Sequence, residues 1–173
     1  MKVLSLFDGI SCGLVALKSL GVKVDEYHAF EIDETAIKIS TNNHPEIIRH
    51  GDVTKADFNE FAGFDLLLGG SPCQDLSISK RNREGLKGSR SSLFWCYVEA
   101  LNTVKPKYFL FENVGSMTEE DKQIITEALG VKPILINSAL VSAQQRKRWY
   151  WSNIPGITQP EDKGIVVADI VGG

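Results

Sequence analysis

The chain has 173 residues, of which 43% are hydrophobic and 24% charged, and its formal net charge is −3. This length and composition fit one soluble globular domain with a substantial core, and the small negative charge excludes a polycation, so that nucleic-acid contact would need a local basic patch. No apolar run approaches the ~18 residues of a membrane span, and three widely spaced cysteines fit neither a disulfide framework nor a zinc site, which favours a reducing cytoplasm.

The first strand is predicted over residues 3–7 and the first helix over residues 13–20. Between them lies the loop Phe7-Asp8-Gly9-Ile10-Ser11-Cys12-Gly13. Glycines let a backbone approach a ligand closely, and the N-terminus of a helix offers free N–H groups. The spacing differs from the dinucleotide fingerprint G-x-G-x-x-G, so the loop alone fits a tight turn as well as a cofactor site.

Acidic residues follow the next two strands. The strand predicted over 24–31 ends at Glu31 and precedes a helix over 34–42, and Asp52 follows a short strand that opens at Ile47. Glu31 could accept hydrogen bonds from both hydroxyls of a ribose, and Asp52 would lie beside the exocyclic amine of an adenine. Each carboxylate alone could simply be solvated. Three such positions at the C-terminal ends of consecutive strands predict a cofactor that contains adenosine.

The fourth strand is predicted over 65–68, and a Gly-Gly pair leads from it into Ser71-Pro72-Cys73-Gln74. A thiol is thereby placed on a loop where parallel sheets carry their chemistry, with Pro72 fixing the local backbone. A free thiol is only a few per cent ionised at neutral pH, so a nucleophilic Cys73 needs activation. A lone cysteine is usually structural, but the tight loop favours the nucleophile.

A long polar loop runs over residues 75–90, with five positive side chains and two negative ones. A loop of this length is usually functional or disordered. Because it follows the candidate nucleophile directly, we expect a basic lid that can follow a phosphate backbone. A helix is predicted over 91–104.

The fifth strand is predicted over 108–111, and Glu112-Asn113-Val114 follows it. A carboxyl group at the end of an adjacent strand would be partly desolvated, which helps it to hold a proton near neutrality. Glu112 and Cys73 would then form an acid–nucleophile pair. The alternative is a Glu-Asn pair that caps a helix, the next helix being predicted over 119–129.

A basic run follows the strand predicted over 134–137, with Arg146, Lys147 and Arg148 beside aromatic residues and a late strand over 149–151. In a strand, Arg146 and Arg148 would share one face and could grip a polar ring or a phosphate. A solvated basic edge strand is the alternative. Residues 154–173 lose the alternation and predict a linker or the start of a further region, leaving a domain over 1–153.

Strands that alternate with helices in this way predict an α/β fold: a doubly wound, mostly parallel sheet with helices on both faces. The candidate residues all fall at strand ends of such a sheet.

These motifs, in this order, resemble the DNA cytosine carbon-5 methyltransferases, and the text from Gly70 to Ser77 is especially close to their de novo animal branch. The resemblance covers residues 3–153 and implies a Rossmann-like methyltransferase fold that binds S-adenosyl-L-methionine and releases S-adenosyl-L-homocysteine. It assigns cofactor binding to Phe7, Asp8, Gly9, Ile10, Ser11, Gly13, Glu31, Ile32, Asp52, Val53 and Pro72. It assigns catalysis to Cys73, Glu112, Arg146 and Arg148, and it implies no metal.

The implied reaction begins with a cytosine flipped out of the DNA stack. Cys73 would attack carbon 6 while Glu112 protonates ring nitrogen 3, and carbon 5 would take the methyl group before it loses its proton and the cysteine leaves. Arg148 would hold the carbonyl oxygen of the base, and Arg146 would help to order the catalytic loop.

Complete members of the family are longer and carry a target-recognition region and a C-terminal segment that packs on the cofactor domain. We therefore expect the catalytic half of a split or truncated enzyme, lacking the closing segment, with DNA and a second polypeptide as partners and no membrane. A non-catalytic regulatory paralogue and a transfer-RNA methyltransferase are the alternatives. The expected location is the cytoplasm of a bacterial or phage-infected cell, or the nucleus of a eukaryotic one.

Overall fold

A computed structural model describes residues 1–71 and 93–172. Pro72, Cys73 and the basic loop predicted over 75–90 lie outside the described residues. Within the two described ranges, no helix is long and apolar enough to cross a bilayer.

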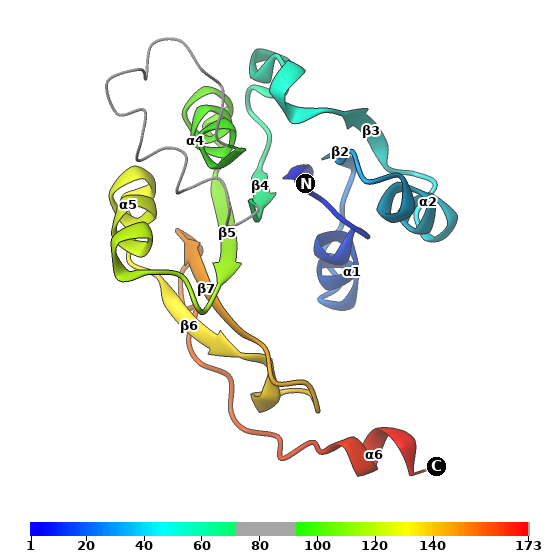
Figure 1. The fold of residues 1–173 in the computed structure, drawn as a ribbon. Helices are drawn as coiled ribbons and strands as arrows, with labels where there is room; N and C mark the ends of the chain where they lie inside the picture. Colours follow the sequence, from blue (N-terminus) through cyan, green and yellow to red (C-terminus); the bar gives the residue numbers. More distant parts are fainter. Residues whose placement is uncertain (72–92, 173) are drawn as a thin grey trace.

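The described residues form a seven-stranded sheet in the order β3-β2-β1-β4-β5-β7-β6. Neighbours among β1 to β5 pair in parallel, whereas β7 pairs antiparallel with both β5 and β6. The strands are β1 (Lys2–Leu6), β2 (Glu26–Phe30), β3 (Ile48–Gly51), β4 (Leu66–Gly69), β5 (Tyr108–Val114), β6 (Ile134–Asn137) and β7 (Lys147–Ser152). The predicted α/β fold with a mostly parallel sheet is confirmed (Figure 1).

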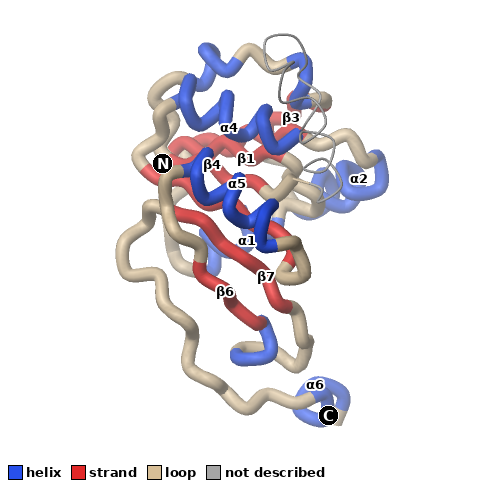
Figure 2. Tube along the Cα trace, turned by 60° about the vertical axis from the view of Figure 1, so that its left-hand side comes forward, coloured by secondary structure: helices blue, strands red, loops and turns tan. Residues whose placement is uncertain are grey.

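Helices connect the strands and cover the sheet (Figure 2). They are α1 (Cys12–Ser19), α2 (Glu34–Asn43), α4 (Leu93–Val104), α5 (Glu119–Leu129) and α6 (Val167–Val171), with short 3-10 turns η1 (Val53–Lys55), η2 (Phe58–Phe61) and η3 (Ser138–Leu140). Their ends follow local chemistry. The Asp33 carboxylate accepts a hydrogen bond from the Ala36 N–H at the start of α2, and Gly130 ends α5 with a φ of 70°.

Two hydrophobic cores lie on opposite faces of the sheet, because side chains alternate along β1. Val3 faces a smaller core that includes Leu14 of α1 and Tyr27 of β2. Leu4 and Leu6 face the larger core, to which α4, α5, η2 and the fully buried Trp151 of β7 contribute. Helices therefore cover both faces, as the alternation of elements predicts.

Three details differ from the sequence-based expectations. β5 extends to Val114, so Glu112 and Asn113 end the strand instead of following it. β7 lies between β5 and β6, so the alternative of a basic edge strand is wrong. Residues 167–171 form the short helix α6 within the segment expected to be a linker, and Figure 1 shows it at the end of an extended stretch of chain.

Candidate functional site

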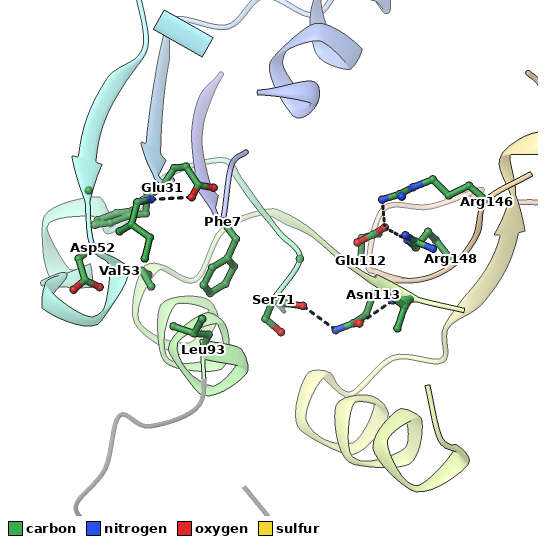
Figure 3. Close-up of a pocket in the computed structure, with 15 residues that line it drawn as sticks. Phe7, Glu31, Asp52, Val53, Ser71, Leu93, Glu112, Asn113, Arg146 and Arg148 are labelled. Atoms are coloured by element: carbon green, nitrogen blue, oxygen red, sulfur yellow. Dashed lines mark hydrogen bonds and ion pairs between the residues drawn. The ribbon is translucent and has the colours of Figure 1, made fainter. Parts of the chain in front are cut away.

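A cavity of about 400 Å³ opens at the edge of the sheet where β1 to β5 end, which is within the size range of ligand pockets. Strand ends, the start of α4 and the start of β7 all contribute to its wall. Its lining residues are Phe7, Phe30, Glu31, Ile32, Gly51, Asp52, Val53, Gly70, Ser71, Leu93, Glu112, Asn113, Val114, Arg146 and Arg148. Figure 3 shows Glu31 and Asp52 on one side of Phe7 and the Glu112–arginine group on the other.

Glu31 connects the loop after β1 to the end of β2. Its Oε2 accepts a hydrogen bond from the Gly9 N–H at 2.8 Å. Its Oε1 accepts from the N–H groups of Ile32 and Asp33 at 2.8 and 2.9 Å. A carboxylate has about four lone-pair positions, so Glu31 can still accept a hydrogen bond from a ligand hydroxyl in the cavity.

Asp52 follows β3 and is held in its ionised form by its own turn. The N–H and the hydroxyl of Thr54 donate to its Oδ1 at 3.0 and 2.8 Å. These hydrogen bonds lower the pKa of the Asp52 carboxyl from its usual value, the N–H contributing most. Asp52 therefore offers acceptors and no donor to a ligand at neutral pH.

Glu112 meets both arginines at the other end of the cavity. The Arg148 Nε lies 2.8 Å from Glu112 Oε1, and an Arg146 guanidinium nitrogen lies 3.8 Å from the same oxygen. The side chain of Glu112 is 30% exposed and that of Arg148 is 19% exposed, so this ion pair is partly withdrawn from water. The antiparallel register of β5 and β7, which pairs Val114 with Arg148, produces the contact.

The chain that leads toward Cys73 is fixed from β5. The buried Asn113 donates from its Nδ2 to the Ser71 carbonyl oxygen at 3.2 Å, and its Oδ1 accepts from the Val114 N–H. A Cβ at Gly70 would lie 3.0 Å from both the carbonyl oxygen and the Oε2 of Glu112. The two residues before Pro72 therefore pack directly against the Glu112–Asn113 strand end.

Comparison with known proteins identifies the family of the chain. The family of C-5 cytosine-specific DNA methylases matches residues 1–163. The chain belongs to this family.

Relatives within the family are longer. The chain is 37% identical over 162 residues to an orphan methyltransferase of Bacillus phage SPR, covering 87% of this chain and 37% of the relative. It is 28% identical over 168 residues to a type II methyltransferase of Neisseria gonorrhoeae, covering 94% of this chain and 39% of the relative. The chain thus spans less than half the length of these curated relatives.

The fold also matches a solved structure of a candidate DNA modification methyltransferase encoded within a prophage of E. coli. The TM-score is 0.67 at 24% identity, over 88% of this chain and 46% of the other. This likeness confirms the Rossmann-like fold class.

Most residues that the family motifs assign to catalysis or cofactor binding line one cavity. They are Phe7, Glu31, Ile32, Asp52, Val53, Glu112, Arg146 and Arg148. The structure thereby joins the predicted cofactor residues of β1 to β3 with the predicted catalytic residues of β5 and β7.

The remaining residues of the predicted cofactor loop lie outside that cavity. Asp8 and Gly9 line a separate small cavity, and Ile10 lines a groove with residues of α1 and α2. Ser11 is fully buried. Gly13 packs so closely against Leu68 and Tyr27 that a Cβ there would lie 2.7 Å from the Leu68 side chain.

Phe30 and Leu93 line the cavity but were not among the predicted site residues. Phe30 immediately precedes Glu31 at a strand end, and that position is a signal which could have identified it. Leu93 belongs to the helical apolar pattern of α4, which is typical of core residues. No local signal separates it from them.

Proposed function

We propose that the chain is the catalytic and cofactor-binding part of an enzyme that transfers a methyl group from S-adenosyl-L-methionine to carbon 5 of cytosine in DNA. One observation carries the proposal. At one end of a single cavity lie two carboxylates, Glu31 and Asp52, which can accept hydrogen bonds from ribose hydroxyls and from an adenine amine. At the other end lies the Glu112–Arg148 ion pair. The segment before Cys73 packs on the wall between them.

The residues present fit the cofactor. Phe7 and Val53 offer apolar contact, Asp52 offers acceptors suited to an exocyclic amine, and Glu31 offers acceptors suited to ribose hydroxyls. When bound, S-adenosyl-L-methionine supplies an electrophilic methyl group on a sulfonium. Pro72 is assigned to the same site and lies outside the described residues.

The protein chemistry at the base is proposed as follows. The Cys73 thiolate forms a bond to carbon 6 of a flipped cytosine, and ring nitrogen 3 takes a proton from Glu112, which makes carbon 5 nucleophilic. After methylation, carbon 5 loses its proton to a base, the sulfur–carbon bond breaks to release the Cys73 thiolate, and ring nitrogen 3 returns its proton to Glu112. Arg148 positions Glu112 and holds the carbonyl oxygen of the base, and Arg146 orders the neighbouring loop.

DNA is the proposed macromolecular substrate, in the cytoplasm of a bacterial or phage-infected cell. Arg146 and Lys147 are exposed at the start of β7, where they can contact phosphates beside the cavity. Target recognition is proposed to come from a region outside these 173 residues, on the same or a second polypeptide. The length of the relatives supports this division, because the chain covers only 37% of the phage enzyme.

A methyl-transfer assay tests the proposal. The chain, alone and mixed with candidate partner polypeptides, is incubated with radiolabelled cofactor and either cytosine DNA or transfer RNA. Label should enter DNA in at least one mixture, and DNA containing 5-fluorocytosine should trap a covalent adduct that Cys73→Ser abolishes. Tight cofactor binding with no transfer and no adduct would favour a regulatory role, and preferential labelling of transfer RNA would replace the substrate.

A further inference from the structure

The loop between β1 and α1 adopts a conformation that its residue types disfavour. Phe7 and Ser11 have φ angles of 59° and 67°, in the left-handed region that non-glycine residues rarely adopt. Such residues are strained, and their conformation persists only where its surroundings fix it. Phe7 lines the main cavity, so whatever fixes this loop also sets the wall of the site.

A chain of hydrogen bonds reaches this loop from β3. An Arg49 guanidinium nitrogen donates to the Ser40 hydroxyl at 2.7 Å, and the Ser40 and Ser11 hydroxyl oxygens lie 2.5 Å apart. The Ser11 hydroxyl donates to Asp8 Oδ2, and the Tyr27 hydroxyl donates to Asp8 Oδ1 at 2.7 Å. The chain therefore links β3, α2, the loop and β2.

The direction of every proton in this chain is determined by its ends. A guanidinium only donates and an ionised carboxylate only accepts. Each serine has one hydroxyl proton, so Ser40 must donate to Ser11 and Ser11 must donate to Asp8. Burial, together with the neighbouring Asp8, raises the pKa of Tyr27 well above its usual value, so Tyr27 also remains a donor at neutral pH.

The hydrogen-bond chain from Arg49 to Asp8 is buried at its two serines and anchored at Arg49. Ser11 is 0% exposed and Ser40 is 2% exposed, so the loss of a hydroxyl partner leaves a buried polar group without it. The Arg49 guanidinium also donates to the carbonyl oxygens of Ile47 and His44 at 2.9 and 3.2 Å. It is thus held by the segment between α2 and β3 and cannot follow the loop if the loop moves.

From Asp8 the restraint continues to the cavity through backbone bonds. The Asp8 N–H donates to the Phe30 carbonyl oxygen at 3.1 Å, and the adjacent Gly9 N–H donates to Glu31. Neither Ser40 nor Arg49 is among the described residues that line the main cavity. Both act on it through the loop.

We infer that Ser40 and Arg49 are positioning residues for the cofactor: through Ser11 and Asp8 they hold the loop of residues 7–11, with its left-handed Phe7 and Ser11, in the conformation that places Phe7 and Glu31 at the cavity. The cofactor part of this inference rests on the proposed function. The conformational part does not, and the two parts separate experimentally.

The test uses Ser40→Ala, Arg49→Met and a matched control, Thr126→Val. Thr126, on α5, accepts a hydrogen bond from Trp151 Nε1 at 3.0 Å. Thr126→Val therefore also removes a hydroxyl that is the partner of an interior group, but at a site away from the loop. Hydrogen exchange without cofactor is followed at the amides of Asp8, Gly9 and Ser11. The Asp65 amide, which donates to the Lys2 carbonyl oxygen at the opposite end of β1, is the remote reference. Affinity for S-adenosyl-L-homocysteine is measured by calorimetry well below the unfolding transition.

Ser40→Ala and Arg49→Met should speed exchange at the loop amides relative to the Asp65 amide and weaken binding of S-adenosyl-L-homocysteine about tenfold. Thr126→Val should lower thermal stability and leave both readouts unchanged. Loop exchange and affinity equal to wild type in both site variants would overturn the inference. A wild-type chain that binds no S-adenosyl-L-homocysteine would refute the proposed function, and the exchange data alone would then decide the loop restraint.

Discussion

Glu112 is constrained from two sides. The Arg148 guanidinium holds one carboxylate oxygen, and Gly70 lies so close to the residue that a Cβ there would be 3.0 Å from its carbonyl oxygen and from its Oε2. A β-carbon here would be closer to the Glu112 carbonyl oxygen than most Cβ contacts, so Glu112 or the Gly70 backbone would have to shift by a few tenths of an ångström. The segment before Cys73 and the proposed acid therefore depend on each other for their positions.

Gly70→Ala should reduce turnover at least tenfold in the mixture that supports methyl transfer, because it displaces Glu112 and general acids contribute about 10²–10⁴-fold to rates. The affinity for S-adenosyl-L-homocysteine should change less than turnover. Gly130→Ala is the control, since its φ of 70° is strained for alanine although nothing lies within 4 Å of its Cβ. Turnover equal to wild type in Gly70→Ala would show that Glu112 needs no such packing.

Strand ends show how far the sequence predicts this site. The sequence predicts Glu31 and Asp52 because each stands at the end of a predicted strand, and a parallel sheet brings such positions to one edge. The meeting of Arg146 and Arg148 with Glu112 could not be read in the same way, because it depends on β7 pairing antiparallel with β5. Hydrophobic periodicity indicates a strand but names no partner for it.

Ser40 shows a second limit. In the sequence it is followed by Thr41, Asn42 and Asn43 near the end of a helix, where a solvated position is the ordinary expectation. In the fold it is buried and connects Arg49 to Ser11. Such a connection is formed by residues from separate elements, so no local pattern contains it.

The pairing of β2 and β3 carries two imidazoles. His28 Nδ1 and His50 Nε2 lie 2.8 Å apart, and the two rings are stacked with centroids 5.1 Å apart. Burial and the neighbouring His28 lower the pKa of His50 from 6.5, and Glu60 opposes this shift. As the pH falls, His50 therefore binds a proton at a higher pH in the unfolded chain than in the folded protein.

Stability should consequently fall as the pH drops below 6.5, until the lowered pKa of folded His50 is reached. Urea denaturation at about pH 7.5 and about pH 5.5 measures the loss of unfolding free energy between the two pH values. This loss should be smaller for His50→Gln than for wild type. The contribution of a single proton is at most about 1.4 kcal/mol per pH unit. The lowered pKa values of Asp52 and Asp57 act only near and below pH 3.8, outside this window. Equal pH dependence in the two proteins would contradict the prediction.

β7 is anchored through Trp151, which is fully buried and donates to the Thr126 hydroxyl at 3.0 Å. Trp151→Phe should lower the free energy of unfolding by about 1–3 kcal/mol, because it removes this hydrogen bond and leaves part of the indole volume unfilled. Urea denaturation measures the change. Trp149→Phe, at a partly exposed position on the same strand, should cost less, and a reversed order would rule out Trp151 as the anchor.

On the scale of the whole molecule, the two cores stabilise a sheet whose functional edge is assembled from residues far apart in the chain. Binding at that edge should therefore stabilise the entire cooperative unit. S-adenosyl-L-homocysteine at 100 times its Kd should add about 2.7 kcal/mol, which raises the Tm by about 5–10 °C for a chain of this size. Thermal scans with methionine alone serve as the control. An equal shift with methionine, or none with the nucleoside ligand, would contradict an adenosine site.

The reversed direction of β7 has a consequence for how this architecture can diversify. Because Asn137 pairs with Lys147, and Arg148 pairs with Val114, the turn from β6 to β7 lies at the same edge as the cavity. A parallel seventh strand would need a crossover that begins at this edge and returns at the other. Insertions grafted into residues 138–146 would therefore grow over the mouth of the cavity without altering either core, making this hairpin a natural place to engineer a new substrate preference.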